Sequence, residues 1–307
     1  MTRKLLLVAT LLIAACSPEE KAVEVPTDPV VVYASYPDST YLPALFDAYT
    51  KETGTIVIVR NGDADAMVDD VISNEISPPA DVLITPSVRG VYRAAEEGAL
   101  RPIDADTVEG HVPHQLMDAD RFWAALTYRG TAIVGDAAQA GLGVLAEPGY
   151  RERLCLSSAS NPSNLAVLAT LIQEYGNRPA ELMVRGWVAN LGREPFETEA
   201  KLLAAIKTGD CAVGIATVAS AREHGLAAEK LTGFVDIEGV GVARHARNPE
   251  GAQHLVRWLL SDEIQERHAA STRSSAATSG FDGDRNVGIV AWYYDEAVKL
   301  AERARYY

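Results

Sequence analysis

The 307-residue chain has little cysteine and too few basic residues to balance its acidic ones. It contains three cysteines, 28 lysines and arginines, and 42 aspartates and glutamates, for a formal net charge of −14. This balance disfavours nucleic acids and anionic membrane surfaces as partners, although a single basic side chain can still bind an anion. The apolar share of 48% and charged share of 23% are ordinary for a folded chain. The length is sufficient for two α/β lobes with separate cores.

The chain also lacks the short motifs of common enzymes. It has no P-loop, G-x-S-x-G elbow, H-E-x-x-H helix or dinucleotide-binding fingerprint. His111 and His114 flank a proline in a loop-like stretch, and Tyr293 and Tyr294 precede the last expected helix. We interpret both pairs as structural. The sequence therefore predicts no enzyme activity, no cofactor and no protein-built metal site.

The N-terminus has the features of an export signal. Arg3 and Lys4 precede a short apolar run, and Ile-Ala-Ala-Cys at 13–16 resembles a bacterial lipobox. We predict a lipoprotein signal peptide over 1–16, with lipidation at Cys16, and a polar, proline-containing tether over 17–29. An uncleaved anchor is the alternative, but the apolar run is too short to span a bilayer. Removing the signal leaves 26 basic and 42 acidic residues, a charge of −16.

Export has a consequence for the two remaining cysteines, Cys155 and Cys211. An oxidising compartment favours disulfides, and two cysteines allow one bridge. The alternative is a metal site, but no further Cys or His lies nearby at ligand spacing. We therefore predict a Cys155–Cys211 disulfide.

The stretch Phe122–Asp136 reads as one long apolar strand that is interrupted by Tyr128, Arg129 and Gly130. Burying a guanidinium without a partner is costly. We predict that this strand leaves one lobe and enters a second, with Arg129 at the cleft between them. A surface strand with a solvated Arg129 is the alternative.

An apolar strand, a short polar turn and a helix follow one another four times, starting near residues 30, 80, 153 and 211. This alternation predicts mainly parallel sheets, with ligands bound beyond the carboxyl ends of the strands, where helix N-termini favour anions. For the turn at 157–161, ordinary helix capping is the alternative. The predicted ligand-binding residues are Tyr36, Asp38, Ser39, Thr85, Ser87, Tyr128, Arg129, Ser157, Ser158, Ser160, Asn161 and Thr217.

A second strand, 234–243, is predicted to return across the cleft. The predicted first lobe comprises 30–127 and 232–270, and the second lobe comprises 128–231. We expect 271–307 to form a loop and a helix that pack on the second lobe.

Ten segments along the chain suggest a known family. They are VYASY, LFDAYTKETG, NGDADAMV, PPADVLITPS, LTYRGTAIVGD, RLCLSSASN, GWVANL, TGDCAVGIA, GVGVARHARNPEGA and DEAVKLAERA. In this order they resemble the periplasmic solute-binding proteins of ABC importers, ferric-iron-binding branch, from Val30 to Arg305. The resemblance implies a type II periplasmic-binding-protein fold, with two lobes joined by hinge strands, that delivers its ligand to a membrane permease. Both paired cysteines fall where some members place a disulfide.

The resemblance also implies a ferric site made by tyrosines, with a His or Glu and sometimes an anion held by an arginine. Here Thr217 and Val218 replace an adjacent tyrosine pair, Ser163 replaces another tyrosine, and Pro37 stands where a histidine is common. Ferric iron needs several anionic oxygen ligands. The sequence therefore predicts a monomeric, lipid-anchored binding protein for a small anionic solute. The alternatives are ferric iron or an iron chelate, and a sensory module that docks on a membrane receptor.

Overall fold

The computed structural model describes residues 28–36, 40–74, 79–136, 141–278, 281 and 283–307. The predicted signal peptide with Cys16, most of the tether, Asp38 and Ser39 lie outside these residues. None of the helices formed by the described residues has the length and hydrophobicity needed to cross a lipid bilayer.

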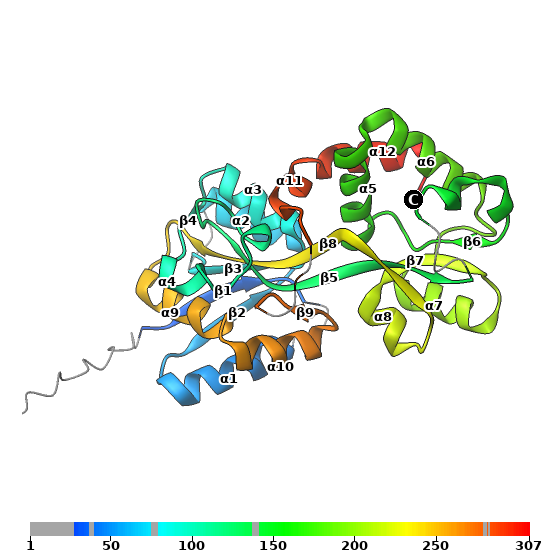
Figure 1. Ribbon diagram of the computed structural model, residues 1–307. Coiled ribbons are helices and arrows are strands. Elements are labelled where there is room, and N and C mark those ends of the chain that lie inside the picture. The colour runs from blue at the N-terminus through cyan, green and yellow to red at the C-terminus, as the bar shows by residue number, and fades with distance from the viewer. Residues whose placement is uncertain (1–27, 37–39, 75–78, 137–140, 279–280, 282) are drawn as a thin grey trace, which may run out of the picture.

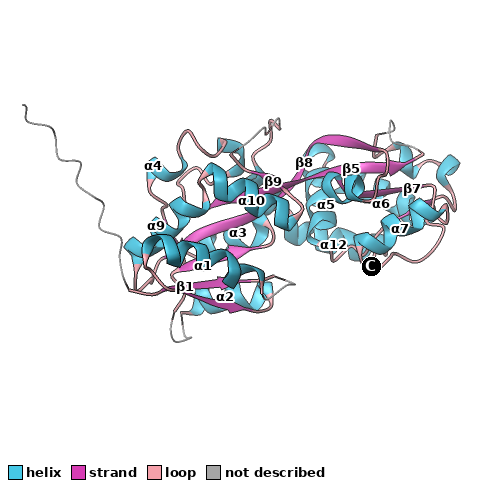
Figure 2. Ribbon diagram, turned by 90° about the horizontal axis from the view of Figure 1, so that it is seen from below, coloured by secondary structure: helices cyan, strands magenta, loops and turns pink. Residues whose placement is uncertain are grey.

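Two lobes lie side by side, and two long strands run through both of them (Figures 1 and 2). These crossing strands are β5 (Ala124–Gly135) and β8 (Ala228–Ala243). The other strands are β1 (Val30–Ala34), β2 (Val57–Asn61), β3 (Val82–Thr85), β4 (Leu100–Arg101), β6 (Leu154–Cys155), β7 (Val213–Thr217) and β9 (Ser275–Ala276). The prediction of one strand leaving and one returning between the lobes is confirmed.

Helices cover the sheet in each lobe (Figure 2). The first lobe contains α1 (Tyr41–Thr53), α2 (Ala64–Ser73), α3 (Val88–Glu96), α4 (Ala105–Val108), α9 (Pro249–Leu259) and α10 (Asp262–Thr272). The second contains α5 (Pro162–Tyr175), α6 (Asn177–Ala189), α7 (Glu199–Thr208) and α8 (Val218–Glu223). The chain ends with α11 (Val287–Trp292) and α12 (Tyr294–Ala304). Short 3₁₀ helices occupy His114–Leu116, Val144–Ala146 and Pro148–Tyr150.

The sheet is mixed, which corrects the expectation of mainly parallel sheets. Its strand order is β2-β1-β3-β8-β5-β7-β6, with β4 paired to β8 and β9 to β5. Only β1–β2, β1–β3 and β6–β7 pair in parallel among the described strands. The crossing strands are antiparallel to each other and to their neighbours because they carry the chain between the lobes in opposite directions.

Local sequence explains how several elements begin and end. The strands β1 and β3 are apolar and buried along their whole length, as expected for strands covered on both faces. Gly54 ends α1 in the left-handed conformation, with φ of 76°. Pro162 opens α5, where its missing N–H costs nothing.

The second lobe contains a disulfide between Cys155 and Cys211, with an S–S length of 2.05 Å and a Cα–Cα distance of 5.9 Å. Both cysteines are buried in a cluster with Leu202, Leu203 and Ile206 of α7. The predicted disulfide is confirmed.

The C-terminal segment contacts both lobes. The final helix, α12, packs on α5 and α6 of the second lobe, while α11 contacts α3 of the first lobe as well as α5. The predicted lobe boundaries, and the assignment of 271–307 to the second lobe, stay predictions.

Candidate functional site

A cavity of about 510 Å³ lies where the two lobes meet the crossing strands. Its walls come from the end of β1, the start of α1, the end of β3, both crossing strands, the start of α5 and the end of α10. The lining residues are Ser35, Tyr36, Tyr41, Pro86, Arg129, Pro162, Ser163, Glu238, Ser271, Thr272 and Arg273. Both lobes therefore contribute polar groups to one space.

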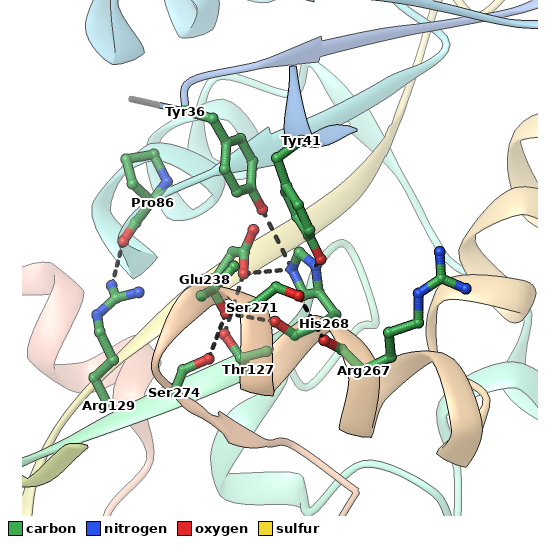
Figure 3. Close-up of polar contacts among 11 residues, drawn as sticks. Tyr36, Tyr41, Pro86, Thr127, Arg129, Glu238, Arg267, His268, Ser271 and Ser274 are labelled. Carbon is green, nitrogen blue, oxygen red and sulfur yellow. Dashed lines mark hydrogen bonds and ion pairs between the residues drawn. The ribbon is translucent and has the colours of Figure 1, made fainter. Parts of the chain in front are cut away.

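Three side chains of this wall and the buried His268 behind them form a hydrogen-bonded group, here called the Tyr–His–Glu cluster: Tyr36, Tyr41, Glu238 and His268 (Figure 3). The Tyr41 hydroxyl lies 2.8 Å from His268 Nδ1. On the other side of the ring, His268 Nε2 lies 2.7 Å from Glu238 Oε2 and 3.3 Å from the Tyr36 hydroxyl. Each imidazole nitrogen therefore faces a different set of oxygens.

Neighbouring residues fix the positions of these side chains. Asn61 holds the backbone of Tyr36 by accepting from its N–H at 2.8 Å and donating to its carbonyl at 2.9 Å. Thr127 on β5 donates to Glu238 Oε2 at 3.1 Å across the crossing strands. Burial raises the pKa of Tyr41, and a hydrogen bond with Ser271 partly offsets that rise.

Arg129 lines the cavity but also has protein partners. Its Nη2 donates to the Pro86 carbonyl and lies 3.4 Å from Asp236 Oδ2. Asp236 is fully buried and also accepts from the backbone N–H groups of Val88 and Ile237. Burial raises the pKa of Asp236, and the Arg129 charge opposes that shift. Arg129 thus stands on a strand that crosses between the lobes, and it is paired with a buried carboxylate and not solvated on a surface strand.

Comparison with known proteins identifies the family. The family model described as bacterial extracellular solute-binding protein matches residues 30–270. The chain belongs to this family. It is a family of binding proteins, which agrees with the prediction that the chain is not an enzyme.

Among the relatives of this solute-binding protein is iron uptake protein A1 of Synechocystis sp., 26% identical over 280 residues, which cover 83% of this chain and 78% of the relative. A Trichodesmium protein in complex with iron and citrate ligands superposes with a TM-score of 0.80 at 24% identity, covering 91% of this chain and all of that one. The periplasmic binding protein AfuA of Actinobacillus pleuropneumoniae, solved with fructose-6-phosphate, gives 0.68 at 14% identity, covering 91% and 98%. These likenesses confirm the predicted type II periplasmic-binding-protein fold.

Some predicted site residues of the solute-binding protein lie at the cavity, and others lie next to it. Tyr36 and Arg129 line the cavity. Thr85, Ser87 and Ser160 line a smaller cavity of about 150 Å³, which shares Pro86 and Pro162 with the larger one. The two spaces are thus neighbours that share part of their walls.

The turn at 157–161 contributes mostly to local structure. Ser157 is buried, and its carbonyl accepts from Tyr306 at 2.7 Å. The hydroxyls of Ser158 and Ser160 lie 2.9 Å apart. Asn161 is the N-cap residue of α5 without a side-chain capping bond.

Two further predicted residues, Thr217 and Tyr128, have their contacts elsewhere in the structure. Thr217 caps α8 by accepting from the N–H of Ser220, and its hydroxyl also donates to Glu199 at 2.8 Å. Tyr128 is buried against Phe281 in an edge-on contact, with ring centroids 5.2 Å apart. Neither residue is among those that line this cavity.

The sequence analysis missed Tyr41, Glu238 and His268. Tyr41 precedes the apolar residues of α1 and was passed over as part of that helix, while His268 stands in an otherwise polar helix. The carboxylate of Glu238 was the one feature of the sequence that could have indicated this part of the site. It lies in the apolar stretch at 234–243, where an acidic residue needs a partner as much as Arg129 does.

Proposed function

We propose that this protein is the extracytoplasmic binding component of an ABC importer, and that its cargo is ferric iron in complex with a small anionic ligand. The observation that carries this proposal is the shared interlobe cavity, where phenol and carboxylate oxygens face guanidinium groups. Its volume of about 510 Å³ suits a small complex.

The chemistry of the wall favours a hard cation together with an anion. Ferric iron prefers anionic oxygen ligands, which Tyr36 and Glu238 can supply. Arg129 and Arg273 face the same space and can hold the anion by charge-assisted hydrogen bonds. Two similar proteins, an iron uptake protein and a protein solved in complex with iron and citrate, support the same cargo class.

An iron-free organic anion is the second candidate. The same two arginines favour it, and the similar AfuA structure contains a sugar phosphate. In that case the anion would take the place that we assign to the iron complex, and the tyrosines would only donate hydrogen bonds.

Contacts across the cleft support a protein that closes over its cargo. Arg273, at the end of α10 in the first lobe, pairs with Glu223 of α8 in the second lobe at 2.9 Å. A membrane permease that recognises the closed form is the partner that this function requires. We expect the protein to act as a periplasmic monomer.

Native mass spectrometry of protein exported by its own cells tests the proposed cargo. We expect a bound mass that contains one iron and at least one small anion, both released on unfolding. An organic anion without iron would support the second candidate, and repeated isolation of protein without any cargo would contradict both.

We also propose that the mature protein is anchored by a lipid on Cys16. The lipobox-like sequence at 13–16 and the polar stretch that follows it support this anchor. Replacing Cys16 with serine is expected to move the protein from the membrane pellet to the soluble fraction of fractionated cells. Retention of Cys16→Ser in the pellet would contradict a lipid anchor.

A further inference from the structure

The Glu238 carboxylate is buried, and only one of its two oxygens has hydrogen-bond partners among the described residues. Its Oε2 accepts from Thr127 and faces His268, whereas its Oε1 is buried without a hydrogen-bond partner among the described residues. A buried acceptor without a partner is costly, so native proteins rarely keep one without a function. Because Glu238 lines the cavity, its carboxylate lies next to any cation that enters there.

The atoms near Glu238 are spaced like neighbouring ligands of one metal ion. Ligand atoms at right angles, with bonds of about 2.0–2.2 Å, lie roughly 2.8–3.1 Å apart. The spacing from His268 Nε2 is 2.7 Å to Glu238 Oε2 and 3.3 Å to the Tyr36 hydroxyl. Both spacings from His268 Nε2 therefore lie within a few tenths of an ångström of the range for neighbouring ligands of one metal ion.

Tyr41 differs from Tyr36 because it faces the other imidazole nitrogen, Nδ1, at 2.8 Å. A carboxylate can only accept, so we assign the imidazole proton to Nε2 in the absence of metal, and the Tyr41 hydroxyl then donates to Nδ1. A metal on Nε2 requires the proton on Nδ1, which then donates to the Tyr41 oxygen. The Tyr41 hydroxyl can then donate to the Ser271 oxygen instead. That oxygen is free to accept because the Ser271 hydroxyl donates its hydrogen to the Arg267 carbonyl at 3.0 Å.

We propose that Tyr36 Oη, His268 Nε2 and the Glu238 carboxylate coordinate the ferric ion, and that Tyr41 is a positioning residue that orients His268. This inference rests on the proposed function. The imidazole stays neutral, the Tyr36 phenol releases one proton to solvent, and the remaining positions face the cavity for the anion. None of these three residues occupies the positions where the resemblance implied tyrosines, which hold Ser163, Thr217 and Val218.

The phenolate-to-iron charge-transfer band in visible absorption tests this ligand set. Purified protein is titrated with ferric nitrilotriacetate, and native mass spectrometry measures the bound iron. We expect the band in the wild type and its loss in Tyr36→Phe, which keeps the backbone that Asn61 holds. Tyr41→Phe should keep the band and bind iron roughly 10–100-fold more weakly, as is typical when a partner of a metal-bound histidine is removed.

A matched control comes from a second tyrosine–histidine pair on the same helix. Tyr49 of α1 lies 2.8 Å from His254 Nδ1 and does not line the cavity. Tyr49→Phe should therefore leave both the band and the affinity unchanged.

The outcomes separate this inference from the proposed function. A band that survives in Tyr36→Phe, or disappears in Tyr41→Phe, would overturn the ligand set, as would iron bound by the wild type without any band. Failure of the wild type to bind iron in any complex would overturn the proposed cargo itself. If Tyr36→Phe does not fold, X-ray absorption at the iron edge of the wild type decides, because the ligand set requires one imidazole nitrogen among oxygen donors.

Discussion

Replacing Arg129 with alanine should lower the free energy of unfolding by about 3–5 kcal/mol, because it leaves a buried carboxylate without its cation. Asp236 has a side chain only 1% exposed and depends on Arg129 for its charge partner. Chemical denaturation of the wild type and the variant measures this difference. The exposed Arg273→Ala is the matched control, since surface ion pairs contribute at most about 1 kcal/mol.

The same variant should show a characteristic pH dependence. Burial raises the pKa of Asp236 in the folded protein, and loss of the Arg129 charge raises it further. A group whose folded pKa is raised contributes stability at low pH that is lost as the pH rises through that value. Arg129→Ala should therefore be closer to wild-type stability in acid than at neutral pH. Unchanged stability with weakened cargo binding would show instead that Arg129 serves only the ligand.

Removing the disulfide should destabilise the protein by about 4 kcal/mol, the loop-closure entropy expected for the 56-residue separation of Cys155 and Cys211. The double variant Cys155→Ala/Cys211→Ala also loses packing with Leu202 and Ile206, which adds to the effect. Denaturation of oxidised wild type, reduced wild type and the double variant separates the two contributions.

The loss should be largest in the second lobe, where both cysteines and their packing partners lie. Amide hydrogen exchange measures this difference when the protection of β7 in the second lobe is compared with that of β1 in the first lobe. Equal loss of protection in both strands would contradict a lobe-specific role, and unchanged denaturation curves would contradict a stabilising role altogether.

Much of the fold could be predicted because its signals are local. Apolar strands, polar turns and helix-opening residues follow one another along the chain, and Arg129 in the middle of an apolar strand marked the crossing between the lobes. The direction of the strands was harder to predict. Each strand–turn–helix unit favours parallel pairing, whereas the antiparallel centre of the sheet arises from contacts between β5 and β8, about a hundred residues apart.

The site was less predictable because its parts come from distant segments. Tyr36 and Arg129 lie beside motifs that the sequence displays, but His268 of α10 reaches Tyr41 of α1 and Glu238 of β8 only in the folded chain. The resemblance implies a tyrosine pair at the positions of Thr217 and Val218, and neither of these residues can supply a phenolate. The sequence alone therefore argued against iron. Contacts across some 230 residues are invisible to spacing rules, and these contacts assemble the Tyr–His–Glu cluster.

Anomalous X-ray diffraction at the iron absorption edge, from crystals of protein loaded with ferric citrate, tests the proposed cargo and its location most directly. The predicted result is one strong iron peak in the interlobe cavity, within bonding distance of Tyr36 Oη and Glu238, with density for an anion extending toward Arg129. An iron peak confined to the protein surface, or an occupied cavity without anomalous signal, would contradict the account.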